Sequence, residues 1–154
     1  MARPTFTSPI PSVAAWLGGL GVLPFGLCAL LAMRPDGALN AVGLKALLGY
    51  GAVILSFLGG IHWGLAISPE SLEKTPSFGR LSVSVLPALI AWPALLVPPA
   101  LGFVLLAGAF IAMFFVDVHA SRTGLAPSWY PRLRLSLSCA AATSLIAGAY
   151  LGMA

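Results

Sequence analysis

Residues 100–116 read ALGFVLLAGAFIAMFFV, an apolar run without a single charged or hydrogen-bonding side chain. Such a run is typical of a helix that crosses the hydrocarbon of a bilayer, which takes roughly 20 apolar residues. The rest of the chain has the same character, since 59% of its 154 residues are hydrophobic and only 8% are charged. A water-soluble surface needs far more charge than this. The sequence therefore predicts an integral membrane protein.

Four further apolar runs accompany this one, and short polar or proline-rich connections separate them. Five spans with their connections use nearly the whole chain, so residues 1–154 are predicted to form a single transmembrane domain. The expected fold class is all-α, a polytopic membrane bundle of five transmembrane helices. The fourth helix is expected to continue past its apolar run and to end near Gly124, because glycine favours a helix C-terminus. The predicted spans are residues 13–33, 44–67, 81–97, 100–123 and 133–153.

The distribution of Lys and Arg predicts how the bundle lies in the membrane. Cytoplasmic connections carry an excess of these residues. One side of a five-span bundle would hold Arg3, Lys74, Arg80, Arg122, Arg132 and Arg134, whereas the other would hold Arg34 and Lys45. The sequence thus predicts a cytoplasmic N-terminus and a C-terminus on the opposite side.

Two predicted spans carry small residues at every fourth position, which places each set along one helix face. Such faces form smooth grooves that a second helix can approach closely. We expect these grooves to make contacts within the bundle, with a homodimer interface along the fifth span as the alternative. The two sets are Ala52, Ser56, Gly60 and Gly64 in the second span and Ala140, Ser144, Gly148 and Gly152 in the fifth.

The segment 59–64, GGIHWG, places an ionisable side chain inside an apolar run. His62 lies about 7 Å inside the predicted cytoplasmic boundary of its span, at 1.5 Å per residue. At that depth it needs a partner or a wet cavity. We expect Asp117, which follows an apolar run at the same level, to be this partner. The topology gathers a candidate polar cluster at this end of the bundle: His62, Trp63, Glu70, Arg80, Asp117, His119, Arg122 and Arg134.

Three interpretations of this cluster stay open. In the first it is a polar cap that fixes helix register, with Asp117 paired to Arg80 or Arg134. His62 would then donate a hydrogen bond within the cap. In the second it is a small-molecule or proton site, because imidazole exchanges protons near neutral pH. In the third, His62 and His119 ligate a metal or haem, but no ligand spacing such as Glu-x-x-His supports this.

Other classes of function lack their sequence motifs. The chain has neither a Gly-x-x-x-x-Gly-Lys phosphate loop nor a Gly-x-Ser-x-Gly nucleophile elbow. Its net charge of +4 does not indicate nucleic-acid binding, because the basic residues flank apolar runs. Cys28 and Cys139 lie within apolar runs and are predicted to be free thiols. We therefore expect no enzyme, no metal and no cofactor.

Residues 50–64, YGAVILSFLGGIHWG, resemble the central signature of the domain of unknown function 3429 family, whose members are bacterial and mitochondrial, transmembrane protein 69-like proteins. Further similar elements are Val85-Leu86-Pro87 with Trp92, then Asp117, then the segment 127–134, PSWYPRLR. The resemblance covers roughly residues 13–150. It implies a small multi-span protein of bacterial inner membranes and mitochondria, without an assigned activity or a list of catalytic residues.

The absence of catalytic motifs, together with the small-residue faces, favours a non-enzymatic accessory or scaffold protein for a membrane complex. The expected partners are the lipid bilayer and either another membrane protein or a second copy of this chain, and not nucleic acid. The alternative is a small transporter or proton-coupled permeation unit that uses His62 and Asp117 at the cytoplasmic mouth. The expected location is the bacterial inner (cytoplasmic) membrane, as a multi-pass protein.

Overall fold

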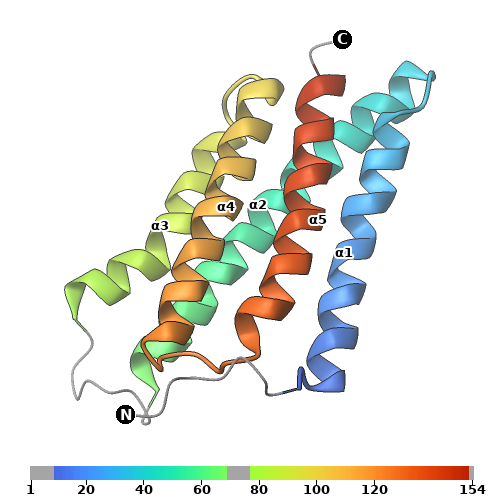
Figure 1. Ribbon diagram of the computed structural model, residues 1–154. Helices are drawn as coiled ribbons and strands as arrows, with labels where there is room; N and C mark the ends of the chain where they lie inside the picture. Colours follow the sequence, from blue (N-terminus) through green and yellow to red (C-terminus); the bar gives the residue numbers. More distant parts are fainter. Residues whose placement is uncertain (1–8, 69–76, 153–154) are drawn as a thin grey trace.

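The computed structural model of the protein describes residues 9–68 and 77–152. Its described residues form five α-helices and no strand, which confirms the all-α fold. Successive helices run in opposite directions, so α1 begins and α5 ends at opposite ends of the bundle (Figure 1). The helices are α1 (Ser12–Ala32), α2 (Gly37–Ile67), α3 (Phe78–Ala94), α4 (Pro99–Arg122) and α5 (Tyr130–Leu151).

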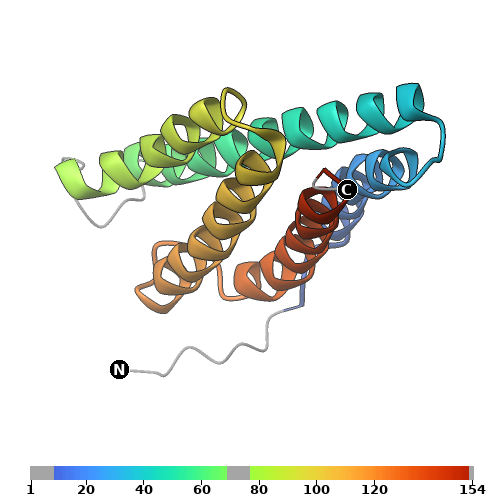
Figure 2. The ribbon, with the colours of Figure 1, turned by 90° about the horizontal axis from the view of Figure 1, so that it is seen from above.

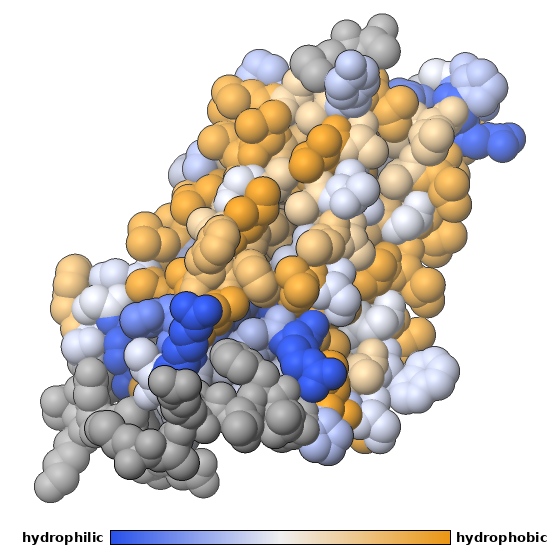
Figure 3. All heavy atoms as spheres, in the orientation of Figure 1, coloured by the Kyte–Doolittle hydropathy of each residue, from blue (hydrophilic) through white to orange (hydrophobic). Residues whose placement is uncertain are grey.

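The described helices have the dimensions of a membrane protein. The helices α1, α2, α4 and α5 are long and apolar enough to cross a bilayer. The helix α3 is also apolar, and its 17 residues lie at the lower limit of a spanning helix. The surface of the bundle is apolar over its middle and hydrophilic toward its ends (Figure 3). The protein is therefore a polytopic helical membrane bundle.

Capping and proline residues shift the helix boundaries from those predicted. The helix α2 begins at Gly37 rather than at residue 44, because the Asp36 side chain accepts a hydrogen bond from the Ala38 N–H at 2.9 Å and caps the helix. The prolines at 98 and 99 end the α3–α4 connection and begin α4. The helix α5 begins at Tyr130 rather than at residue 133, and the last residue of its predicted span, 153, lies outside the described residues.

The helix α2 is the centre of the bundle among the described elements, since it contacts each of the other four helices. Seen from above, α3 lies alongside α2 (Figure 2). The helix α4 packs against both of them, whereas α5 packs between α4 and α1 and also contacts α2. The core consists of large apolar side chains that are less than 2% exposed, and they come from α2, α4 and α5: Leu47, Leu55, Phe103, Leu106, Phe110 and Leu145.

Glycines bring helix backbones into direct contact at the end of the bundle where α1 finishes. A Cβ added at Gly43 would lie 2.3 Å from the backbone nitrogen of Ala32. A Cβ added at Gly102 would lie 2.3 Å from the carbonyl oxygen of Ala94. Neither helix pair could keep its spacing with any larger residue, so both contacts are of the small-residue type that is common in membranes.

The prediction that the small-residue face of α2 packs inside the bundle is wrong for its second half. Gly60 and Gly64 are exposed, and a Cβ at either would meet no atom within 4 Å. The packed surface is displaced by one residue, because a Cβ at Gly59 would lie 2.3 Å from the carbonyl oxygen of Ser84. The apolar neighbours of this face, Leu55 and Leu58, determine which side of the helix turns inward.

The small-residue face of α5 is also displaced. Gly148 is buried against Phe103, whose ring would lie 2.8 Å from an added Cβ. The other predicted positions are not buried: Ala140 and Ser144 are half-buried and Gly152 is exposed. The inward face of α5 instead follows the line of Arg134, Ser138, Ala141, Leu145 and Gly148.

Candidate functional site

Asp117 continues a buried apolar stripe on α4. The buried side chains of this stripe recur at spacings of three and four, as one face of a helix requires. They include Phe103, Leu106, Phe110 and Met113, and the next position on this face is Asp117, which is 1% exposed. The apolar residues before it therefore turn the carboxylate into the protein rather than toward lipid.

His62 and Arg134 also lie on helix faces that apolar side chains turn toward the inside of the bundle. His62 follows Leu55 and Leu58 on the inward face of α2 and is 9% exposed. Arg134 begins the inward face of α5 and is 4% exposed. Each of the three polar side chains is held inside the bundle because the apolar residues of its own helix fix the rotation of that helix.

A tight connection between α4 and α5 brings Arg134 to the level of Asp117. The helix α4 ends in a Schellman turn, in which Gly124 has a φ of 77° and the Leu125 N–H donates to the Ala120 carbonyl oxygen at 2.8 Å. The Ser121 hydroxyl then donates to the Pro127 carbonyl oxygen at 3.0 Å. The predicted helix end at Gly124 is confirmed.

The three side chains form one hydrogen-bonded group that joins three helices, and we call it the His62–Asp117–Arg134 triad. The Nε2 of His62 lies 2.8 Å from Oδ1 of Asp117. The Nε of Arg134 donates to Oδ2 of the same carboxylate at 2.7 Å. Of the two partners predicted for Asp117, Arg134 is therefore the one in contact.

The chemistry of the triad follows from these contacts. As a carboxylate, Asp117 can only accept hydrogen bonds, so the Nε2 of His62 carries the hydrogen in this arrangement. In the neutral imidazole the other ring nitrogen, Nδ1, is then an acceptor. The charges of Asp117 and Arg134 balance one another, and the removal of one would leave the other buried without a counter-charge.

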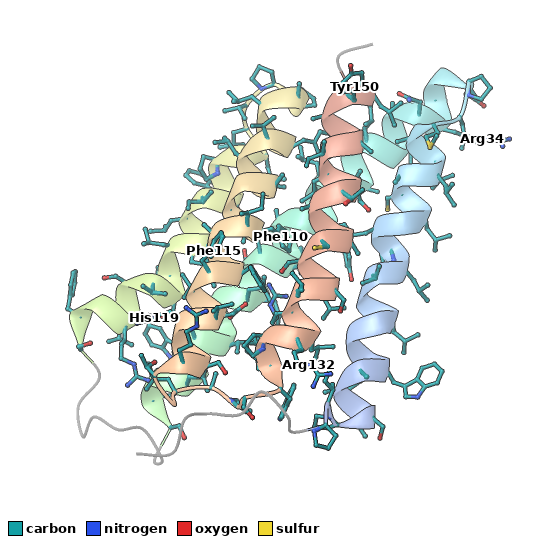
Figure 4. The ribbon with its side chains drawn as sticks, in the orientation of Figure 1. Arg34, Phe110, Phe115, His119, Arg132 and Tyr150 are labelled. Atoms are coloured by element: carbon teal, nitrogen blue, oxygen red, sulfur yellow. The ribbon has the colours of Figure 1, made fainter. Side chains whose placement is uncertain are left out.

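A cavity of about 230 Å³ opens beside His62, between α2, α3 and α4. Its wall combines His62 with Arg80 and His119 and with apolar side chains. The guanidinium of Arg80 donates to the Leu65 carbonyl oxygen at 2.9 Å, which holds the arginine at the cavity. His119 is exposed, so the wall of this cavity reaches the surface of the bundle. Figure 4 shows His119 at the same end of the bundle as Arg132, opposite Arg34 and Tyr150.

The remaining members of the predicted cluster do not join the triad. Trp63 is 44% exposed and Arg122 is also exposed. Glu70 lies outside the described residues. Within residues 9–68 and 77–152, no three His, Cys, Asp or Glu side chains are grouped as they would be around a metal ion.

Ser138 is a buried polar residue that the sequence reasoning missed. It lies one turn after Arg134, and neither its Oγ nor the Nη2 of Arg134 has a hydrogen-bond partner among the described residues. The spacing of four between Arg134 and Ser138, continued by Ala141 and Leu145, would have indicated a shared face.

Comparison with known proteins identifies the family. The chain matches the model for a protein of unknown function, DUF3429, over residues 10–150. It belongs to the DUF3429 family. The predicted resemblance is thus confirmed, and the family match covers all five helices and the whole His62–Asp117–Arg134 triad.

Two relatives of this DUF3429 protein have the name transmembrane protein 69. The protein from Xenopus tropicalis is 38% identical over 139 residues, which cover 88% of this chain and 53% of the relative. The protein from Mus musculus is 29% identical over 148 residues, which cover 92% of this chain and 57% of the relative. The chain thus spans about half the length of the relatives it matches. No solved structure gives a significant match.

Proposed function

We propose that this multi-pass membrane protein is a small permeation unit, in which the cavity beside His62 receives a proton or a small polar solute at the cytoplasmic mouth. The observation that carries the proposal is that this cavity of about 230 Å³ ends on an ionisable side chain that belongs to a buried ion-paired group. Ionisable residues within spanning helices commonly mark ion and substrate pathways.

The cavity and the triad have complementary roles in this proposal. The cavity, at about 230 Å³, is large enough to hold water beside His62. Arg80 and His119 supply polar groups at its wall, and His62 connects these groups to the buried carboxylate. His62 thus lies between the cavity that it lines and the Asp117 carboxylate, 2.8 Å from its Nε2. No bond of a substrate is made or broken, so the proposal is not that of an enzyme.

Proton flux in proteoliposomes tests this function. A pH-sensitive dye inside the vesicles would report acidification after an external pH jump, for the wild type, His62→Ala and Asp117→Asn. We expect each variant to lower the flux roughly tenfold, equivalent to about 1.4 kcal/mol on the barrier. Arg122→Gln is the matched control, because Arg122 is an exposed residue of α4 outside the cavity. Equal flux in all proteins would refute the proposal.

A second candidate function is that of a non-enzymatic accessory protein for a membrane complex. The exposed glycines Gly60 and Gly64 favour it, because they leave a smooth surface on α2 that no described residue of the chain covers. Trp63 and Phe57 beside them are also exposed. Gentle detergent extraction followed by co-purification tests this candidate. Recovery of a partner from the wild type but not from Gly64→Leu would support it, and recovery of the lone chain from both would count against it.

The proposed location is the inner membrane of a bacterium, with the triad at the cytoplasmic side. The excess of Lys and Arg in the connections at that end supports this orientation. Reporter tags at the two termini test it, because α1 begins and α5 ends at opposite ends of the bundle. We expect an N-terminal tag to report the cytoplasm, and tags that report one shared compartment would contradict the orientation.

A further inference from the structure

A second cavity, of about 210 Å³, lies on the other side of the triad, between α1, α2, α4 and α5. It shares no wall residue with the cavity beside His62. Its wall is apolar apart from Arg134, the only charged side chain among the described residues that line it. Phe25, Phe57 and Phe110 place aromatic rings in the same wall.

Arg134 is the polar side chain in the wall of this second cavity. Its Nε is engaged by Asp117 at 2.7 Å, but its Nη2 is buried without a partner among the described residues. A buried donor without an acceptor is costly, and native proteins rarely leave one. The hydroxyls of Ser138 and Tyr130 are also buried without a partner among the described residues, but neither residue lines the cavity. Arg134 is therefore the side chain of this wall that can donate to an acceptor oxygen from outside the chain.

The charge of the site indicates which kind of acceptor it takes. The positive charge of Arg134 is already balanced by Asp117, with which it is in direct contact. An anionic head group would therefore add an uncompensated charge to a buried site, at a large desolvation cost. A neutral carbonyl oxygen accepts a hydrogen bond from the guanidinium and leaves the charge balance unchanged.

The route into this cavity favours a molecule that arrives through the lipid. Leu17 on α1 and Phe57 on α2 line it and are 65% and 62% exposed, so its rim lies on the apolar surface of the bundle. We propose that this cavity binds a neutral, lipid-soluble molecule whose carbonyl oxygen accepts from Arg134. A membrane quinone and the acyl ester of a neutral lipid both carry this group. This proposal is independent of proton flux at His62.

Gly21 allows the cavity to be filled without disturbing the triad. It lines the cavity, and a Cβ at this position would lie 3.9 Å from the Tyr50 hydroxyl, an ordinary contact. Gly21→Leu therefore places a side chain in the space proposed for the ligand. Gly26→Leu is the matched control on the same helix, since Gly26 is exposed and a Cβ there meets no atom within 4 Å. Arg134→Lys tests the donor itself, because lysine lacks the second guanidinium nitrogen.

Photoaffinity labelling of the full chain in detergent micelles tests the proposal. The probe is a benzoquinone with a diazirine in its alkyl tail, and the competitors are decylbenzoquinone, dioctanoylglycerol and decanoate. We expect labelled peptides from α1 and α5 and roughly tenfold weaker labelling of Gly21→Leu and Arg134→Lys than of Gly26→Leu. Thermal unfolding of Gly21→Leu at the wild-type temperature would show that the bundle is intact.

The competitors separate the ligand sources. Displacement by decylbenzoquinone alone would assign a quinone, and displacement by dioctanoylglycerol would assign an acyl ester, and both support a carbonyl site. Displacement by decanoate alone would overturn the proposal in favour of an anion site. Labelling of Gly21→Leu that equals that of Gly26→Leu would also overturn it, because the probe would then bind elsewhere.

Discussion

The two ends of the bundle are held together by different forces. At the end where α1 finishes and α2 begins, glycines let backbones touch, as Gly43 does against Ala32 and Gly102 against Ala94. At the other end three helices are joined by hydrogen bonds and opposite charges, through His62, Asp117 and Arg134. Gly59 makes a similar close contact with Ser84 toward the second end. What distinguishes the second end is therefore its buried charges, with a cavity on each side of them.

This difference indicates where function lies. Lipid tails are as apolar as leucine, so helices in a membrane associate chiefly through close packing, and small residues are sufficient for it. Buried ion pairs add little net stability and are costly when half-removed. The second end therefore holds groups that packing alone would not require. These groups suit the binding of a ligand, because two cavities and unpaired hydrogen-bond donors lie at this end.

The largest expected effect is at the charged end. Asp117→Ala would leave Arg134 buried without a counter-charge and His62 without its partner, at a cost of about 3–5 kcal/mol in the free energy of unfolding. SDS-induced unfolding of the purified protein in mild detergent would measure this cost. A variant as stable as the wild type would show that the charges at this end do not hold the helices together.

The next effect is at the packed end. Gly43→Ala would place its Cβ against the backbone of Ala32 and force α1 and α2 apart, which we expect to cost about 1–3 kcal/mol. Gly49→Ala on the same helix is the matched control, because a Cβ there meets no atom within 4 Å. It should stabilise the helix by about 0.5–1 kcal/mol. If both substitutions shift the unfolding midpoint equally in SDS, close backbone contact is not what joins these helices.

A smaller effect is expected where α1 meets α2 in the middle of the bundle. The Tyr50 hydroxyl donates to the carbonyl oxygen of Gly21 at 2.8 Å. Tyr50→Phe removes this bond and keeps the ring, which packs edge-to-face on Phe25. We expect a loss of about 0.6 kcal/mol, the average for hydrogen bonds between membrane helices. A loss larger than that of Gly43→Ala would mean that polar contacts outweigh close packing between α1 and α2.

The fold was largely predictable because apolar runs identify membrane helices by length and composition alone. The sequence predicted five helices and the end of the bundle at which His62 and Asp117 meet. It could not place the helix starts that depend on a local cap, such as Asp36 before α2. It also assigned the wrong face to the second half of α2, because glycines at every fourth position occur on a lipid-facing surface as well as on a packed one.

The candidate site was predictable in part for a related reason. The depth of His62 and the number of helices set which residues share one end, and Arg134 was among the partners expected for Asp117. The choice of Arg134 over Arg80 depends on the rotation of α3 and α5, which many weak apolar contacts determine together. The unsatisfied Nη2 of Arg134 and the cavity beside it depend on packing between four helices. No local pattern of residues encodes such a space.

The most direct test of the central claim is a double-mutant cycle between Asp117 and Arg134, with the free energy of unfolding measured in SDS. We predict that the double variant Asp117→Ala with Arg134→Ala is more stable than the sum of the two single losses implies, by about 1–3 kcal/mol. That result would show that the two charges are energetically coupled across α4 and α5. Strictly additive losses would contradict the account, because the two side chains would then act independently.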